Sequence, residues 1–186
     1  MRKVIYPMTV SLDGFVESAD GKLDWGDPSE KLHRYFNDRE RMIDLHLYGR
    51  RLYELMAAFW PSVEEDPAAP DYVVEYSRIW KQKPKIVFST KLEQVGWNSR
   101  LVRGNVLEEV SRLKAEPGNY MSVGGPGLAS SLMQLGLIDE YWLYVRPIIL
   151  GAGKRMFPPL GERVPLRLLE TRRFEEEVVL MRYGTE

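Results

Sequence analysis

The sequence predicts an α/β fold in which helices flank a largely parallel central sheet. Apolar runs of strand length alternate along the chain with segments whose apolar residues recur at helical spacing. Glycines directly follow two of the expected strands, at Gly49 and Gly124, as they do where a strand turns into a helix. The 186 residues suffice for one buried core and are few for two, so we expect a single domain over residues 1–186.

Composition narrows the classes of function. The chain is 44% apolar and 28% charged, with a formal net charge of −1, which is typical of a globular domain and lacks the basic excess of a nucleic-acid binder. No apolar run reaches membrane-spanning length and no signal-peptide pattern opens the chain, so we expect a cytoplasmic protein. Cysteine is absent, and His33 and His46 lack ligand-type neighbours, so we expect no metal site.

The N-terminal region combines a strand, a turn and a helix. Residues Lys3–Val10 predict a strand, in which Pro7 indicates a bulge or an edge position. Asp13-Gly14 then turns the chain. Trp25, in the polar loop that follows, either plugs the edge of the core or lines a pocket beside a planar ligand. Asp27-Pro28-Ser29 predicts the start of a helix with Pro28 in its first turn.

Two further strands end in groups that suit an anion. Leu45–Tyr48 runs into Gly49-Arg50-Arg51 at the start of a helix. Arginines at such a junction suit a phosphate because the guanidinium group can bind it in bidentate fashion. The alternative is that both arginines only point into solvent at the start of the helix. The strand Lys85–Phe88 ends in Ser89-Thr90-Lys91.

A glycine turn follows the buried strand Tyr120–Val123. Gly124, Gly125 and Gly127 open a helix together with Pro126 and Leu128. Such a turn lets the backbone N–H groups and the helix dipole approach an anion. The alternative is that the glycines serve only the geometry of the turn. Neither of the two common nucleotide-binding glycine motifs is matched. Because the carboxyl ends of parallel strands share one edge, three anion-suited groups there favour a phosphorylated ligand such as a dinucleotide.

The C-terminal third predicts three strands. Glu140–Leu150 reads as one long strand, and its aromatic run Tyr141–Tyr144 is too large for one monomer to bury completely, which favours a dimer. Leu166–Leu169 and Glu177–Tyr183 are expected as two more strands, the last of them antiparallel to its neighbours.

These pieces, in this order and spacing, resemble the dihydrofolate reductase superfamily over nearly the whole chain. The resemblance is strongest to the reductase domain of the bifunctional riboflavin-biosynthesis deaminase/reductase and its stand-alone relatives. The segments that carry it are Ser11–Gly14, Tyr48–Glu54, Ser89–Lys91, Ser122–Gly127, Leu150–Gly153 and Phe157-Pro158.

The resemblance implies a three-layer fold with a mixed, mostly parallel central sheet of about eight strands, flanking helices and an antiparallel C-terminal strand. It further implies a homodimer that binds NADPH along the sheet edge and reduces a C=N or C=O bond of a small pyrimidine-like or pterin-like heterocycle. The cofactor-binding residues implied are Gly49, Arg50 and Arg51 near the adenosine phosphates, Ser89, Thr90 and Lys91 near the 2′-phosphate, and Gly124, Gly125, Pro126, Gly127 and Leu128 at the pyrophosphate.

On the substrate side the resemblance implies Met8, Trp25 and Glu30. Dihydrofolate reductases also place an acidic residue on the first helix, where this chain has Leu32, so we expect poor dihydrofolate reduction. The candidates for the proton donor are Asp13, Asp24, Asp27, Glu30 and His33. We assign catalysis to Asp13, with a structural role in its Asp-Gly turn as the alternative. The alternative functions are a non-catalytic dinucleotide-binding or sensing module on the same scaffold, and a true dihydrofolate reductase.

Overall fold

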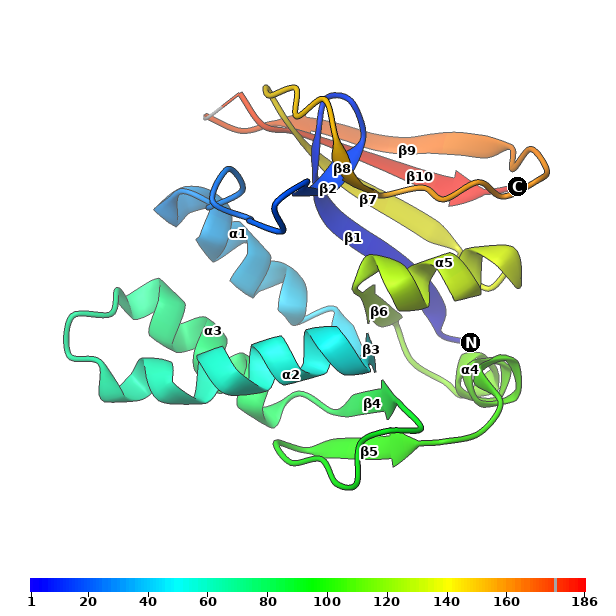
Figure 1. Cartoon of the computed structure of the whole chain (residues 1–186), viewed down its shortest axis with the longest axis horizontal. Coiled ribbons are helices and arrows are strands. Elements are labelled where there is room, and N and C mark those ends of the chain that lie inside the picture. The colour runs from blue at the N-terminus through cyan, green and yellow to red at the C-terminus, as the bar shows by residue number, and fades with distance from the viewer. Residues whose placement is uncertain (176) are drawn as a thin grey trace.

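A computed structural model describes residues 1–175 and 177–186 and contains an eight-stranded sheet (Figure 1). Its strands are β1 (Lys3–Ser11), β3 (Ile43–Gly49), β4 (Lys85–Phe88), β5 (Ser99–Val102), β6 (Tyr120–Gly124), β7 (Glu140–Arg146), β9 (Leu166–Arg173) and β10 (Val179–Thr185). They lie in the order β5-β4-β3-β6-β1-β7-β10-β9. All pairs from β5 to β7 are parallel, whereas β10 runs antiparallel to both β7 and β9. The fold class is therefore confirmed, including the antiparallel C-terminal strand.

Helices cover both faces of this sheet. They are α1 (Glu30–Glu40), α2 (Arg50–Phe59), the 3-10 helix η1 (Trp60–Glu65), α3 (Asp71–Gln82), α4 (Val106–Ala115) and α5 (Pro126–Gln134). Alternation along β3 separates the two faces. Leu45 and Leu47 join a buried cluster with residues of α4 and α5, whereas Tyr48 packs with residues of α2 and α3. Figure 1 shows α1 and α3 on one side of the strands and α4 and α5 on the other.

The irregularity expected at Pro7 is absent from the described β1, which lies inside the sheet and pairs with β7 without a shift of register. The reason lies in the direction of the backbone. Lys3 N donates to Asn119 O, just before β6, so alternate residues of β1, including Pro7, turn their nitrogens toward β6. Pairing with β6 ends at Ile5, so the nitrogen of Pro7 lies where the sheet needs no donor.

Two predicted boundaries are also corrected. Helix α1 begins at Glu30, because the Ser29 hydroxyl accepts a hydrogen bond from Leu32 N at 3.3 Å and caps the helix, so Pro28 precedes the first turn. Strand β7 ends at Arg146, four residues earlier than expected. A separate two-stranded sheet, formed by β2 (Phe15–Ser18) and β8 (Gly153–Arg155), was not predicted.

The aromatic run of β7 does not reach the surface. Tyr141, Trp142 and Tyr144 are at most 4% exposed within the single chain, so they give no reason for a dimer. Exposed apolar side chains lie instead on the edge strand β9, where Leu166, Leu168 and Leu169 are 38%, 54% and 39% exposed. No helix in the part of the chain that the structure describes is long and apolar enough to cross a membrane.

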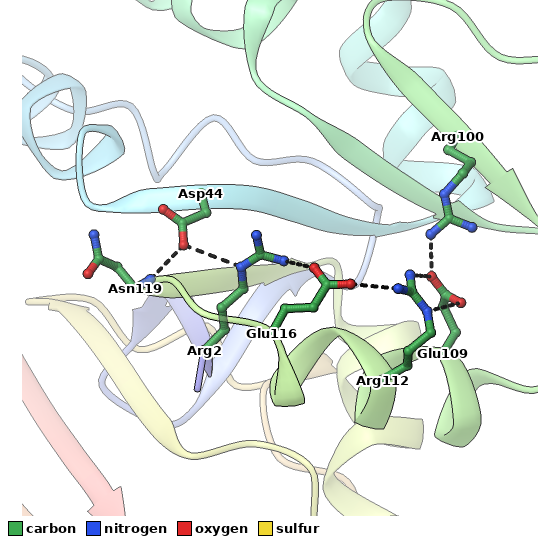
Figure 2. A network of polar contacts seen from close by, with 7 residues as sticks. All are labelled: Arg2, Asp44, Arg100, Glu109, Arg112, Glu116 and Asn119. Atoms are coloured by element: carbon green, nitrogen blue, oxygen red, sulfur yellow. Dashed lines mark hydrogen bonds and ion pairs between the residues drawn. The ribbon is translucent and has the colours of Figure 1, made fainter.

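A network of charged side chains, joined by the backbone nitrogen of Asn119, connects the amino ends of the parallel strands (Figure 2). Its members are Arg2, Asp44, Arg100, Glu109, Arg112, Glu116 and Asn119. Arg2 contacts Glu116 after α4 at 2.7 Å and Asp44 on β3 at 3.5 Å. At the other end of the network, Arg100 on β5 pairs with Glu109 on α4. The network therefore links β1, β3, α4 and β5 at the edge opposite to the glycine turn.

Candidate functional site

The predicted phosphate-binding residues surround a cavity of about 370 Å³ at the carboxyl ends of β4 and β5, which we name the basic cavity. It is lined by Arg50, Phe88, Ser89, Thr90, Lys91, Val102, Arg103, Gly104 and Val106. Four residues expected at the cofactor, Arg50, Ser89, Thr90 and Lys91, are thus brought together. Arg103 was missed, although it follows the end of β5 just as Ser89 to Lys91 follow the end of β4. Arg51 is exposed and lies outside this lining.

Local hydrogen bonds shape the basic cavity. The Ser89 hydroxyl accepts from the backbone nitrogens of Lys91 and Leu92, both at 3.1 Å, and its own proton remains available to a ligand. Arg103 donates to the carbonyl oxygens of Glu93 at 3.2 Å and Thr90 at 3.4 Å, which holds the guanidinium over this loop. Within the described residues no carboxylate lines the cavity, so its charged groups are all positive.

Beside the basic cavity, the N-termini of α2 and α5 lie next to each other. Gly49 caps α2 and Gly125 caps α5, and neither helix has a side-chain cap among the described residues. A Cβ atom on Gly49 would lie 3.7 Å from Leu128 Cβ on α5, and one on Gly125 would lie 3.4 Å from Leu52 Cβ on α2. Two sets of free N–H groups and two positive dipole ends therefore meet at the carboxyl ends of β3 and β6.

The three glycines of the turn differ in whether the protein itself requires glycine at that position. A Cβ atom on Gly124 would lie 2.5 Å from Leu52 Cδ2 and 2.7 Å from the Tyr48 ring, so helix packing requires this glycine. Gly125 has a φ of +86°, which other residues rarely adopt. Gly127 has no described heavy atom within 4 Å of a built Cβ, so nothing in the protein itself requires it. The open side of Gly127 is therefore where a ligand can approach the backbone.

A second cavity, of about 530 Å³, lies between β1 and the helices α1, η1 and α3, and we name it the aromatic cavity. Its wall includes Pro7, Met8, Thr9, Asp27, Pro28, His33, Phe36, Arg39, Glu40, Ile43, Phe59, Trp60, Tyr72, Val73, Tyr76, Trp142 and Tyr144. Met8, one of the residues expected on the substrate side, is part of this wall. Trp25 and Glu30 lie outside this wall, and Glu30 pairs instead with Arg34 at 2.9 Å on the exposed side of α1.

The sequence did not reveal most of this wall. The rings that converge on it come from α1, α2, η1, α3 and β7, and each ring occupies a position whose sequence pattern also suits a buried core residue. Leu32 is 2% exposed and packs in the core with Ile5, Ile43 and Trp142, so the position expected for an acidic residue carries a core side chain. His33, the next residue, faces the cavity instead.

Two titratable groups of the wall, Glu40 and Tyr144, each keep one protonation state near neutral pH. Burial alone would raise the pKa of Glu40, but its interactions with His46, Lys83 and Lys85 together hold the pKa below its ordinary value. Glu40 Oε2 lies 3.1 Å from His46 Nε2 and 4.0 Å from Lys83 Nζ. The Glu40 carboxylate is therefore ionised near neutral pH. Burial raises the pKa of Tyr144 far above its ordinary value, so this tyrosine stays protonated.

Asp13 has a structural task at the turn after β1. Its carboxylate accepts hydrogen bonds from the Ser11 hydroxyl at 2.7 Å, from Leu150 N at 3.1 Å and from Gly151 N at 2.8 Å. The bond from Ser11 is the main reason that the pKa of Asp13 lies below its ordinary value. These bonds account for the residue without catalysis, and the carboxylate they stabilise is a weak proton donor. The catalytic role assigned to Asp13 stays a prediction that its contacts do not support.

Comparison with known proteins identifies the family. Residues 2–180 match the model of the RibD C-terminal domain. The chain is 35% identical over 185 residues to the uncharacterized protein YyaP of Bacillus subtilis (strain 168). The aligned region covers 98% of this chain and 94% of that protein. A structure from Shewanella sp. PV-4, assigned provisionally to riboflavin biosynthesis, has a TM-score of 0.76 at 21% identity and covers 100% of this chain and 99% of that chain.

The fold extends to dihydrofolate reductase. The Enterococcus faecalis enzyme, complexed with NADP(H), is similar with a TM-score of 0.64 at 15% identity, over 99% of this chain and 96% of that chain. The predicted dihydrofolate-reductase-like fold is thereby confirmed. With the family model matched over nearly the whole length, the chain belongs to the RibD C-terminal domain family.

Proposed function

We propose that the protein is a cytoplasmic, homodimeric NADPH-dependent reductase that transfers a hydride to a C=N or C=O bond of a small heterocycle. The observation that carries this proposal is the pairing of two unlike cavities on one sheet. The basic cavity suits a phosphate, and the aromatic cavity suits a flat ring. The adjacent N-termini of α2 and α5 lie between them in the strand order. Membership of the RibD C-terminal domain family supports a reductase.

The spacing of the strands suits a dinucleotide. From β4, beside the basic cavity, to β1, beside the aromatic cavity, the sheet advances by three neighbouring strands through β3 and β6. At ~4.8 Å per step this is about 14 Å, a distance that an extended dinucleotide spans. The 2′-phosphate would then lie at Arg50, Ser89, Lys91 and Arg103, with the pyrophosphate at the two helix N-termini.

The chain's own residues would bind, orient and shield the reactants. NADPH supplies the hydride when bound. Met8 and Thr9 of β1 form the wall beside which the nicotinamide and the substrate would meet, and the rings of Phe36 and Trp60 exclude water there. Glu40 is not a proton source because its carboxylate is ionised, and it is already paired with His46 and Lys83.

The cofactor assignment is tested by titrating the protein with NADPH and with NADH. Each charged hydrogen bond to the 2′-phosphate is worth about 1–2 kcal/mol, so two or three of them give a preference for NADPH of roughly a hundredfold. Arg50→Ala and Arg103→Ala are expected to narrow this preference by about tenfold each. Arg51→Ala, one residue from Arg50 but outside the basic cavity, is the matched control and is expected to leave it unchanged. Equal binding of both cofactors by the wild type would contradict the assignment.

Turnover separates an enzyme from the alternative, a dinucleotide-binding or sensing module without catalysis. The protein is mixed with NADPH and a panel of pterin, pyrimidine and quinone acceptors, and the loss of NADPH absorbance is followed. Oxidation that depends on the acceptor supports the reductase. Tight NADPH binding without oxidation across the whole panel favours the module.

A further inference from the structure

His33 is the residue of the aromatic cavity whose chemistry the proposed function leaves unused. It lies in α1 and faces α3 and η1, where three rings meet it edge-on. The ring centroid of His33 lies 5.1 Å from that of Tyr72, 5.8 Å from that of Tyr76 and 6.4 Å from that of Trp60. Burial lowers the pKa of His33, and the neighbouring Asn37 only partly opposes this effect. The imidazole is therefore neutral near pH 7, with one N–H donor and one acceptor nitrogen.

The position of Asn37 indicates which nitrogen is the acceptor. Asn37 lies one turn after His33 and is 2% exposed. Its Nδ2 donates to Tyr72 O and to Glu75 Oε2, both at 2.8 Å, which fixes the orientation of the amide. His33 Nδ1 and Asn37 Oδ1 are both buried, and no other described residue is a hydrogen-bond partner of either atom. Asn37 acts on the pKa of His33 as a side-chain hydrogen-bond partner, so we assign the imidazole proton to Nδ1. Nε2 is then the acceptor nitrogen of the ring.

The remaining charged groups of the wall are already compensated. Arg39 donates to the Tyr35 hydroxyl at 2.6 Å and lies 3.5 Å from the carboxylate of Glu170. Glu40 is held by His46 and Lys83. Among the described residues of this wall, no cation without a carboxylate partner is left to hold a phosphate. In the basic cavity Arg50 pairs with Glu54 at 3.4 Å, whereas Lys91 and Arg103 pair with no described carboxylate.

We infer that the aromatic cavity takes a planar, uncharged heterocycle without a phosphate group, and that this heterocycle donates a ring N–H to Nε2 of His33. The inference rests on the proposed function because the heterocycle would be the hydride acceptor. It adds the chemistry that recognises the substrate. His33 would be the polar group of α1 that binds the substrate, one position after Leu32, which stands where an acidic residue was expected. It would accept a hydrogen bond while remaining uncharged.

Two flat compounds of the same ring system test the inference. Lumazine carries ring N–H groups, and 1,3-dimethyllumazine has methyl groups in their place. Binding of each to the cofactor-free protein is measured by calorimetry at neutral pH. The wild type is expected to prefer lumazine by about tenfold, the effect of one hydrogen bond. His33→Phe keeps a flat ring among the three aromatic rings and is expected to abolish this preference. His33→Gln, whose amide oxygen can replace the acceptor, is expected to retain part of it.

The possible results distinguish a loss of heterocycle recognition from misfolding and from a loss of cofactor binding. Failure of lumazine to bind, equal binding of both compounds by the wild type, or an unchanged preference in His33→Phe would each overturn the inference. Tighter binding of uridine 5′-monophosphate than of uridine in this cavity would overturn the exclusion of phosphate. NADPH affinity is expected to be equal in all three proteins. If the wild type does not bind NADPH at all, the proposed function fails while the lumazine result still decides this inference.

Discussion

Replacing Gly127 by alanine separates the stability of α5 from its proposed contact with the cofactor. Gly127 is the second residue of α5, and a Cβ atom there would meet no described heavy atom within 4 Å. Because alanine is favoured over glycine in a helix by up to about 1 kcal/mol, Gly127→Ala should stabilise the free protein slightly. For a chain of this size the melting temperature should rise by about 1–4 °C.

The same methyl group should hinder the cofactor. If the pyrophosphate packs against the N-terminus of α5, the methyl keeps it from the backbone N–H groups, and the loss of about 1.4 kcal/mol or more makes NADPH binding at least ~10-fold weaker. Thermal unfolding and a fluorescence titration with NADPH measure the two effects on one sample. Ser131→Ala, an exposed change later in α5, is the control that should leave NADPH affinity unchanged. A stable Gly127→Ala variant with wild-type NADPH affinity would refute the placement of the pyrophosphate.

Three further predictions follow from the structure. Dihydrofolate should be reduced poorly, since Leu32 cannot supply a charged hydrogen bond worth about 1.5–3 kcal/mol, or one to two decades in rate, and efficient steady-state turnover would count against this. The protein should be a homodimer through β9, whose leucines are exposed, and Leu168→Lys should yield monomers in sedimentation equilibrium, whereas a monomeric wild type would refute the contact. Asp13→Asn should lower the melting temperature at pH 7. Because the pKa of Asp13 is depressed in the folded state, the difference in melting temperature from the wild type should vanish as pH falls through that pKa. A difference that persists in acid would show that the Asp13 carboxylate charge is not its cause.

Local patterns predicted the fold and the basic cavity well. The alternation of strands and helices determines a parallel sheet, and the residues just after each strand must gather at one edge. Ser89, Thr90 and Lys91 could therefore be placed near Arg50 without a structure, and they are. Arg103 carried the same signal after β5 and was overlooked because that strand, unlike β4, has no fully buried residues and only a short apolar pattern.

The aromatic cavity could not be predicted in the same way. Trp60, Tyr72 and Tyr76 lie at apolar helical positions, where a ring that lines a cavity and a ring that fills the core leave the same pattern. Which of the two a ring becomes depends on how α1, η1 and α3 pack against each other. The aromatic residues of β7 were misjudged for a related reason. Trp142 and Tyr144 are buried in one core cluster and Tyr141 in the other, both within one chain. Pro7 was misread because the end of β6, distant in sequence, decides what its nitrogen meets.

A crystal structure of the protein with NADPH bound tests the cofactor placement directly. We expect the 2′-phosphate to lie within hydrogen-bond distance of at least two of Arg50, Ser89, Lys91 and Arg103. We expect the nicotinamide ring to lie beside Met8 and Thr9 and to open onto the aromatic cavity. A cofactor bound away from this edge of the sheet, or with its nicotinamide remote from β1, would show that both cavities were assigned wrongly.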